Sequence, residues 1–357
     1  MNICLLYNAH PTGCSYYRLE MPHSKMHEIY GDEIQFFSVD KLEEMTHDEL
    51  RIIDIFIINR TWANIIPAVK PVADVLKTYG AKIILDMDDY WAIEPGHAFY
   101  EEYHKKNMSA VIIEHMKIAD AMITTTKYLA NEIRKINKDV TILENCPSLL
   151  YDQFKPNPTP SDKIRFGYFG ASQHLQDLQH VEIGFERLAH DKSLNGKYTL
   201  YCAGWHEKHA IGLQYEQIFS GKGENDNYGR IAGADIYSYV GGYNFVDVAL
   251  APLKVNKFNA LKSELKIVEA AYMGKTIIAT DIPMYADQID HGVDGYLVKN
   301  NRPGDWYKYI RKMILDPDKT REMAANLEAK IKKRFNAEEI SKRRYELYKR
   351  IKNDISK

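Results

Sequence analysis

Short apolar runs rich in β-branched residues alternate with longer amphipathic segments along the chain. In the first part of the sequence these runs predict strands at 2–8, 34–39, 53–59, 82–88, 121–126 and 140–145. Continuous apolar runs are typical of parallel strands that are buried on both faces. Segments of helix length, such as 64–79 and 98–118, lie between most of these strands. The alternation predicts a doubly wound α/β sheet.

A proline-rich stretch interrupts the pattern at 145–163, because prolines disfavour both helices and central strands. The pattern then restarts with strands predicted at 164–170, 198–204, 246–253, 276–280 and 295–298, and with helices at 303–315, 319–334 and 338–355. We therefore predict a Rossmann-like domain at 1–150, a linker at 151–163, a second Rossmann-like domain at 164–320, and C-terminal helices at 321–357 that pack back on the first domain. The two domains would face a central cleft, lined by the strand ends where ligands of such sheets bind.

The composition is that of an ordinary globular protein, with 357 residues, 45% of them hydrophobic and 27% charged. A net charge of −2 gives no general attraction to nucleic acid or to anionic membranes. The C-terminal helices differ, because ten lysines and arginines between Lys330 and Lys352 are only partly offset by glutamates. They form either a solvated helix face or a contact surface for DNA or anionic lipid.

The four cysteines have neither metal-ligand nor disulfide-framework spacing, which fits a reducing compartment. The N-terminus lacks a basic segment ahead of its short apolar run, and no segment approaches the about 20 apolar residues that cross a bilayer. We expect a cytoplasmic protein, with peripheral membrane attachment through the basic helices as an option.

Three charged residues, Lys262, Lys266 and Glu269, precede a natural helix stop at Gly274. Their spacings of four and three residues would place them on one helix face. Two lysines four residues apart repel each other by a few tenths of a kcal/mol, so a charged ligand would explain why both are present. The alternative is a solvated face that carries a Lys266–Glu269 ion pair.

The start of this predicted helix has the features of an anion site. Ser263 could cap the helix, and the free amides of Ser263, Glu264 and Leu265 lie at the positive end of its dipole. Glu269, about two turns along, could accept hydrogen bonds from a vicinal diol. A site that binds a phosphate at the helix start and a ribose further along would fit a nucleotide diphosphate.

The segment 262–298, KSELKIVEAAYMGKTIIATDIPMYADQIDHGVDGYLV, resembles the donor-binding signature of GT-B glycosyltransferases, particularly the mostly retaining family 4, the glycosyl transferases group 1. The resemblance implies the GT-B fold, a nucleotide diphosphate sugar such as a UDP-sugar as donor, and Glu269 as the carboxylate that holds the donor ribose. The E-x7-E motif of that family has an acidic residue eight positions before Glu269, where this chain has Leu261. Glu264 is the nearby candidate to replace it.

Two further loops resemble this family. In FGYFGASQHLQDL (166–178), Gly170 would let the backbone approach a phosphate, and His174 and Asp177 match a G-x3-H-x2-D-L variant of the first donor-domain loop. In the loop after the first strand, Gly13 permits close approach to the acceptor or to the donor phosphates. Arg18 either reaches an oxyanion or forms a surface or interdomain ion pair.

The stretch DMDDY (86–90) ends a predicted strand where relatives carry a His-Asp pair. Asp88 and Asp89 could orient the acceptor hydroxyl or receive its proton. The D-x-D pattern of Asp86 and Asp88 also suggests a metal, although lysines can meet the phosphate charge instead. A zinc site is a second metal alternative to a surface cluster, at His97, Glu101 and His104. We predict that no metal and no cofactor are required.

Together these features predict a hexosyltransferase that moves a sugar from a nucleotide diphosphate sugar to a hydroxyl acceptor, with retention implied by the resemblance alone. Lys262, Lys266 and the helix N-terminus would stabilise the leaving diphosphate. The acceptor is either a cell-surface or lipid-linked glycan of a bacterium or a hydroxymethylated base in phage DNA. A protein that binds a nucleotide sugar without transferring it is the non-enzymatic alternative, supported by Leu261.

Overall fold

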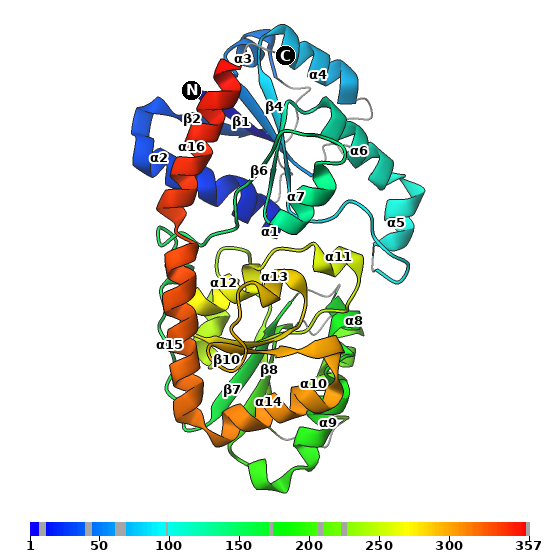
Figure 1. Ribbon diagram of the computed structural model, residues 1–357, viewed down its shortest axis with the longest axis vertical. Coiled ribbons are helices and arrows are strands. Elements are labelled where there is room, and N and C mark those ends of the chain that lie inside the picture. Colours follow the sequence, from blue (N-terminus) through cyan, green and yellow to red (C-terminus); the bar gives the residue numbers. More distant parts are fainter. Residues whose placement is uncertain are drawn as a thin grey trace. The chain divides into compact units, whose positions relative to one another are not determined.

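The structure is a computed structural model, and it describes residues 1–6, 12–39, 45–60, 69–97, 99–170, 174–205, 210–222 and 227–354 (Figure 1). The chain divides into two compact units. Unit 1 comprises residues 1–148, 261–263 and 335–357, and unit 2 comprises residues 149–260 and 264–334. Within the described residues, each unit contains one six-stranded parallel sheet, which confirms the predicted pair of Rossmann-like α/β domains.

The sheet of unit 1 has the strand order β2-β1-β3-β4-β5-β6. Its strands are β1 (Asn2–Leu6), β2 (Gln35–Val39), β3 (Ile55–Asn59), β4 (Lys82–Met87), β5 (Ala121–Thr124) and β6 (Val140–Ile142). Apolar runs bury β1, β3, β4 and β5 almost completely, as expected for strands covered on both faces.

Helices cover both faces of this sheet. One core lies under α3 (His47–Arg51), α4 (Val69–Thr78), α6 (Met108–Ile118) and α7 (Lys127–Ile133). The other lies under α2 (Met21–Tyr30) and α16 (Ala337–Asn353), which pack side by side (Figure 1). The remaining elements are α1 (Gly13–Ser15), the π-helix η1 (Tyr16–Glu20), the 3-10 helix η2 (Gly31–Glu33) and α5 (Tyr100–Lys105).

The sheet of unit 2 has the strand order β12-β11-β10-β7-β8-β9. Counted from β7 as the first strand, this is the 3-2-1-4-5-6 order of dinucleotide-binding sheets. Its strands are β7 (Ile164–Phe169), β8 (Tyr198–Trp205), β9 (Tyr228–Ala232), β10 (Val248–Ala251), β11 (Thr276–Thr280) and β12 (Gly295–Val298).

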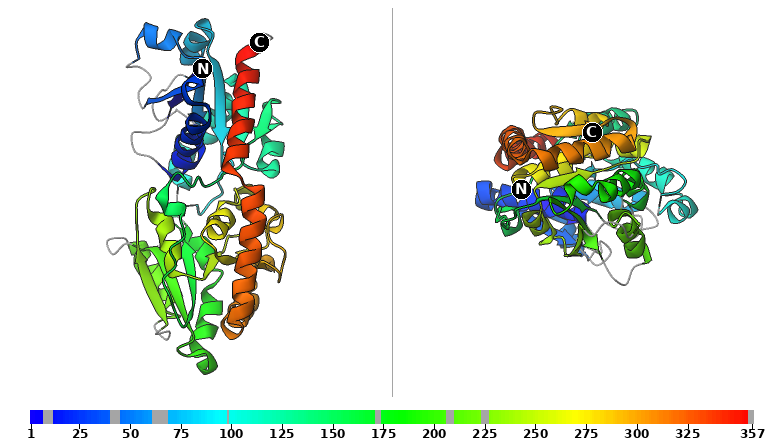
Figure 2. Two further views of the ribbon diagram at one scale, coloured as in Figure 1. Left: turned by 90° about the vertical axis from the view of Figure 1, so that its left-hand side faces the viewer. Right: turned by 90° about the horizontal axis from the view of Figure 1, so that it is seen from below.

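The helices of unit 2 also lie on both sides of the sheet. They are α8 (Leu175–Leu178), α9 (Glu182–His190), α10 (Ala210–Phe219), α11 (Lys257–Ala260), α12 (Leu265–Tyr272), α13 (Pro283–Ala286), α14 (Pro303–Leu315) and α15 (Pro317–Arg334). Among the described residues of unit 2, four 3-10 helices join them, namely η4 (Asp152–Phe154), η6 (Lys192–Leu194), η7 (Tyr239–Phe245) and η8 (Lys299–Asn301). Helix α15 packs against α12 and β11, and α14 packs against α9 (Figure 2).

The unit borders differ from the predicted domain borders at the C-terminal helices. Helix α15 belongs to unit 2, and only α16 packs in unit 1. The chain passes from one to the other at Phe335, which is fully buried in unit 1, and Asn336 then caps α16 by accepting hydrogen bonds from the amides of Glu338 and Glu339. The predicted linker falls in unit 2, where Phe154 is buried.

Two smaller differences concern individual elements. Strand β9 was not predicted, because its sequence YGRIA is short and half exposed at the sheet edge. The helix predicted at 98–118 is divided into α5 and α6 at Asn107, whose backbone is left-handed (φ 49°). Of the helix predicted at 64–79, residues 64–68 lie outside the described part of the chain.

Candidate functional site

In unit 2 the candidate donor site lies where the strand order changes direction, between β7 and β10. Parallel sheets bind ligands at the carboxyl ends of the strands that flank such a point. Strand β7 ends at Phe169, β10 ends at Ala251, and the short helices α11, α12 and α13 lie at this end of the sheet (Figure 1). Residues 171–173 of the predicted phosphate loop lie outside the described residues.

Gly170 follows β7 directly, and its neighbours explain why it is glycine. A Cβ atom at this position would lie 2.2 Å from the hydroxyl oxygen of Tyr168. Any other residue would therefore displace a buried tyrosine at the start of the loop. The predicted contact of Gly170 with a phosphate stays a prediction.

His174 and Asp177, the two residues matched to the loop motif, contact each other in the structure. Asp177 Oδ2 lies 2.8 Å from Nδ1 of His174. The other carboxylate oxygen of Asp177 accepts hydrogen bonds from the amide of Lys254 (2.6 Å) and from the side chain of Asn259 (3.1 Å). Buried Asp177 thus ties the loop after β7 to the segment after β10 and orients the imidazole, so that Nε2 is the nitrogen opposite this contact. Asp177 and Asn259 were not among the predicted site residues.

Helix α12 begins later than predicted, which corrects the assignment of its cap. Its first residue is Leu265, and Glu264 occupies the N-cap position without a side-chain cap. Ser263 lies in unit 1, where its hydroxyl accepts a hydrogen bond of 3.1 Å from Asn145. The positive end of the helix dipole therefore lies at Leu265 and Lys266, and the amide of Ser263 is not part of the first turn.

The three charged residues do not share one helix face, because Lys262 precedes α12 and belongs to unit 1. Glu269 is not solvated but fully buried. Its Oε2 accepts hydrogen bonds from Lys266 Nζ (2.9 Å) and Tyr243 (3.1 Å), and its Oε1 accepts one from Tyr239. Lys266 Nζ also lies 5.3 Å from the ring centre of Tyr239. A ribose bound by Glu269 would have to replace some of these contacts.

Tyr239 and Tyr243 come from η7 and were not predicted as site residues. Their spacing of four residues in YVGGYNF places both hydroxyls on the same carboxylate. The signal that was available is the tyrosine-rich stretch around them, but nothing in the sequence links that stretch to Glu269.

The position where the family motif has its first acidic residue is structural in this chain. Leu261 is 8% exposed and packs in the core of unit 1 with Met87 and Trp91. Glu264, the predicted substitute, is buried in unit 2 just before α12. Its role toward a donor sugar stays a prediction.

In unit 1 a second candidate site lies at the carboxyl ends of β1, β3 and β4, again at the point where the strand order changes direction. Arg60 follows β3 in a left-handed conformation (φ 60°), and its amide donates to the carbonyl of Asp86 over 2.8 Å. Its guanidinium lies 3.8 Å from Asp88 and 3.5 Å from Asp89. Lys262 Nζ lies 3.4 Å from Asp89. Two carboxylates and two cations therefore meet at this edge.

Asp88 and Asp89 differ in their surroundings. Burial raises the pKa of Asp88, Arg60 acts in the opposite direction, and the charge of Asp89 raises the pKa further. Cys14, in α1, contacts Asp88, and burial raises the pKa of its thiol well above the usual range. A carboxyl with a raised pKa is suited to accept a proton from a substrate hydroxyl. Gly13 begins α1 beside Cys14, after the N-cap residue Thr12.

Arg18 is corrected from a candidate catalytic residue to a structural one. It is fully buried and forms a two-point ion pair with Asp86, with Nε–Oδ1 and Nη2–Oδ2 distances of 2.7 and 3.1 Å. Its Nη1 donates to the carbonyl of Leu143 and to Asn145 Oδ1, each over 2.8 Å. Four of its five N–H groups donate hydrogen bonds inside unit 1, so Arg18 has a structural role there.

Among the described residues, no group of three or more histidine, cysteine, aspartate or glutamate side chains is arranged to hold a metal ion. This applies to the D-x-D stretch and to the predicted zinc alternative. None of the helices in the described ranges is long and apolar enough to cross a bilayer.

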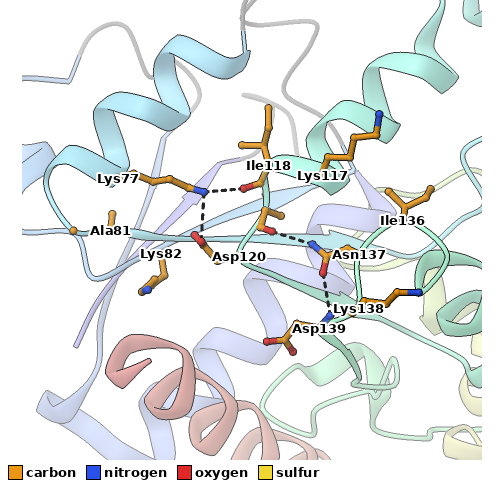
Figure 3. A pocket seen from close by; sticks show the side chains of 12 residues that line it. Lys77, Ala81, Lys82, Lys117, Ile118, Asp120, Ile136, Asn137, Lys138 and Asp139 are labelled. Atoms are coloured by element: carbon orange, nitrogen blue, oxygen red, sulfur yellow. Dashed lines mark hydrogen bonds and ion pairs between the residues drawn. The ribbon is translucent and has the colours of Figure 1, made fainter. Parts of the chain in front are cut away.

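A pocket of about 510 Å³ lies at the opposite end of the sheet of unit 1, where β4, β5 and β6 begin (Figure 3). Asp120 accepts a hydrogen bond from the amide of Ile83, and Lys77 contacts both Asp120 and the carbonyl of Ile118. Figure 3 shows that the ammonium groups of Lys82, Lys117 and Lys138 point in different directions. The pocket is a junction of strand starts and helix ends and does not belong to either candidate site.

The basic C-terminal residues are mostly engaged within the protein. Eight of the ten form ion pairs: Lys330 with Asp290 and Asp294, Lys332 with Glu328, Lys342 with Glu338 and Glu339, Arg343 with Glu144, Arg344 with Asp86, Lys349 with Glu346, Arg350 with Asp139, and Lys352 with Asp54. These pairs neutralise most of the predicted contact surface for DNA or anionic lipid.

Comparison with known proteins connects the donor edge to a family. Residues 265–334 match the family described as Glycosyl transferases group 1. No curated protein matches the sequence.

Solved structures match almost the whole chain. They include a glycosyltransferase from Rickettsia africae ESF-5 (13% identity, TM-score 0.71, 99% of both chains), a sucrose-phosphate synthase from Thermosynechococcus elongatus (13%, 0.69, 98% of both chains) and the Anabaena protein HepE in complex with UDP-glucose (15%, 0.68, 98% of this chain and 100% of that one). At these identities the likeness shows the fold. The whole chain therefore has the two-domain GT-B fold, and residues 265–334 match the glycosyl transferases group 1 family.

Proposed function

We propose that the protein transfers a hexose from a nucleotide diphosphate sugar to a hydroxyl acceptor, with unit 2 binding the donor and the carboxyl edge of unit 1 binding the acceptor. The observation that carries the proposal is the Lys266–Glu269 pair on α12, because it lies inside the family-matching segment and at the edge where the sheet of unit 2 binds ligands. The Anabaena structures that share the fold contain UDP and UDP-glucose, so UDP is the nucleotide we propose.

The residues of unit 2 suit a diphosphate. Lys266 and the first amides of α12 present positive charge, and Glu269 presents two carboxylate oxygens three residues after Lys266. When the donor binds, Lys266 would move from Glu269 to a phosphate, and Glu269 would exchange a contact for the ribose hydroxyls. His174, held by Asp177, would offer Nε2 to the phosphate or to the sugar.

The residues of unit 1 suit activation of an acceptor. Asp88, with its raised pKa, would receive the acceptor proton, while Arg60 and Lys262 keep the pair of carboxylates from repelling each other. The role of Lys262 toward the leaving diphosphate is part of the same proposal. Retention of configuration rests on the family resemblance, and its test is the anomeric configuration of the product by NMR.

We further propose that no metal is required, since lysines and helix amides can meet the phosphate charge. Activity should then persist in excess chelator. A complete loss of activity in chelator that Mn²⁺ or Mg²⁺ restores would contradict this proposal. Asp86 and Asp88 would then again be candidate metal ligands. We also propose a cytoplasmic location, in keeping with four cysteines that form no disulfide in the described part of the chain.

The experiment that tests the enzymatic function uses radiolabelled UDP-glucose and a panel of other nucleotide sugars. Release of labelled sugar to water or to an acceptor is expected, and it should depend on Lys266. Tight binding of a nucleotide sugar without any turnover would instead support a non-catalytic binding protein. That alternative is suggested by Leu261, which stands where the family motif has an acidic residue.

A further inference from the structure

Two tyrosines of η7 bind the carboxylate of Glu269, with one hydroxyl on each oxygen. Tyr239 donates to Oε1, and Tyr243 donates to Oε2 over 3.1 Å. A ribose that is held by Glu269 would present the two hydroxyls of its vicinal diol to the same two oxygens. The pair of phenols therefore occupies the places on the carboxylate that the diol would take.

The two tyrosines are held in different ways. Tyr243 is 1% exposed and stacks on Phe169, the last residue of β7, with ring centres 3.8 Å apart and an interplanar angle of 12°. Tyr239 is only partly buried, and its ring centre lies 5.3 Å from Nζ of Lys266. Tyr243 thus belongs to the packed interior of unit 2, whereas Tyr239 can move without opening that interior.

The burial of Glu269 means that a ligand reaches its carboxylate only when a neighbouring side chain moves. Lys266, whose Nζ binds Oε2, has 33% of its side chain exposed and can be reached from solvent. Its departure to a phosphate would open Oε2 alone. A diol spans both carboxylate oxygens, so Oε1 has to be opened as well, and this requires Tyr239 to leave.

The backbone on either side of Tyr239 is fixed, so the side chain and not the segment would move. Gln153 of η4 donates to the carbonyl of Ile236 over 3.0 Å and accepts a hydrogen bond of 3.3 Å from the amide of Val240. A rotamer change of a partly exposed side chain is fast and needs no rearrangement of the fold. The main cost of moving Tyr239 is therefore the hydrogen bond from its hydroxyl to Glu269.

We propose, on the basis of the proposed function, that Tyr239 stands in for the ribose on Glu269 and leaves when the donor nucleotide binds, while Tyr243 stays. Every nucleotide that uses Glu269 first breaks the phenol bond, which lowers its affinity by the strength of that bond. A ligand that brings hydroxyls to Glu269 forms a bond of the same kind in return. Tyr239 is thereby a specificity-determining residue that favours ribonucleotides over ligands without a diol.

Loss of the two hydroxyls should have different effects on UDP binding. A contact that is present in both the free and the bound protein cancels from the affinity, whereas a contact present only in the free protein opposes binding. Tyr239→Phe should therefore bind UDP about tenfold more tightly, a change of about 1.4 kcal/mol. Tyr243→Phe should not gain affinity. Both variants should melt at a lower temperature without ligand, because buried Glu269 loses a donor in each.

Calorimetry with UDP and with its 2′,3′-dideoxy analogue tests the exchange. The analogue offers no diol to Glu269, so Tyr239 keeps its bond when the analogue binds, and Tyr239→Phe should change its affinity by no more than about twofold. Tyr237→Phe, which removes the hydroxyl of an exposed tyrosine two residues earlier, is the matched control and should leave the affinity for UDP unchanged.

Three results would overturn the proposal, namely unchanged UDP affinity in Tyr239→Phe, weaker UDP binding in that variant, or an equal gain for UDP and for the dideoxy analogue. Each of them would leave the proposed function intact, because UDP still binds. If neither the unaltered protein nor Tyr239→Phe binds any nucleotide diphosphate, the proposed function is rejected together with this inference.

A second measurement needs no loss of a hydroxyl. 3-Fluorotyrosine placed at position 239 of the otherwise unaltered protein reports the surroundings of that ring by fluorine NMR. Saturating UDP should shift this resonance, because the ring leaves the ammonium group of Lys266 and the carboxylate of Glu269. The dideoxy analogue should shift it less, and fluorotyrosine at position 243 should respond less to UDP than fluorotyrosine at position 239. An unmoved resonance at position 239 with UDP bound would show that Tyr239 stays in place.

Discussion

Lys266 Nζ lies 2.9 Å from Oε2 of Glu269, one helical turn further along α12, and this pair places a cation on a fully buried carboxylate. Lys262 lies on a different carboxylate, Asp89 in unit 1. Each lysine thus has its own acidic partner in the absence of a ligand. These two ion pairs contradict the expectation that the lysines repel each other, and we propose instead that a diphosphate would compete with Glu269 for Lys266.

Changing Lys266 to Gln should lower turnover and also lower stability. We expect kcat/KM to fall about 10²-fold or more, the order seen when one preorganised contact to a developing negative charge is removed. The melting temperature without ligand should fall as well, because buried Glu269 loses its cation. Lys319→Gln removes an exposed lysine of α15 that pairs with Glu322 and is the matched control. If the variant loses stability but keeps near-normal turnover, Lys266 serves only as the structural ion-pair partner of Glu269.

Changing Glu269 to Gln should weaken the binding of UDP by about 10- to 100-fold, because a charge-assisted hydrogen bond contributes about 1.5 to 3 kcal/mol. Gln keeps the shape of the side chain, whereas Ala would leave the hydroxyls of Tyr239 and Tyr243 without their buried acceptor. Calorimetry with UDP measures the effect, and Tyr243→Phe serves as a control for lost packing around the carboxylate. Unchanged affinity for every nucleotide diphosphate in Glu269→Gln would exclude the ribose role.

The sequence predicted the two sheets because their strands are apolar on both faces. Strand β3, IFIIN, is a continuous apolar run, and such a run needs no tertiary information to be recognised. Strand β9, YGRIA, was missed since it carries Gly229 and Arg230 and is half exposed, so only its pairing with β8 makes it a strand. The break at Asn107 was missed because neither proline nor glycine marks it.

The candidate site was predictable only as far as it follows from strand ends and local spacing. His174 and Asp177 were recognised by their spacing of three residues in the loop motif, whereas their contact is known only from the structure. The environment of Glu269 was not predictable, because its tyrosine partners lie 26 and 30 residues earlier in the chain. Arg18 was assigned to the site for its position after the first strand, yet its carboxylate partner lies 68 residues away in the interior.

Acid should destabilise unit 1 through His23. This histidine is buried in α2, its Nδ1 donates to the carbonyl of Leu19 over 2.6 Å, and its Nε2 accepts from Tyr348 over 3.0 Å. Burial, together with the positive charge of Arg344 from α16, lowers the pKa of His23 to about 3. The unfolded chain therefore binds more protons below pH 6.5, so stability falls as the pH falls from about 6.5 toward 3.

Unfolding in urea at pH 7, 5.5 and 4 measures this effect. His23→Gln should be less stable at pH 7 but should lose stability less steeply as the pH falls. The flattening should be partial, since burial also lowers the pKa of His115 to about 4. Equal slopes for the variant and the unaltered protein would show that His23 does not govern the acid response.

Arg60 should control the acid limb of the pH–activity profile. If Asp88 receives the acceptor proton, activity falls when the pH drops through the pKa of Asp88, which burial already raises. The guanidinium of Arg60 acts against this rise, so Arg60→Met should raise the pKa of Asp88 further and move the acid limb of kcat/KM to higher pH. The side chain of Met keeps most of the packing of Arg60. Arg60→Lys restores the positive charge and should therefore return the acid limb partway to its original pH.

The control is Arg51→Met, at an exposed ion pair in the same unit, which should leave the pH–activity profile unchanged. A uniform loss of activity at every pH, without a shift of the limb, would assign Arg60 to positioning alone and would remove Asp88 as the proton acceptor.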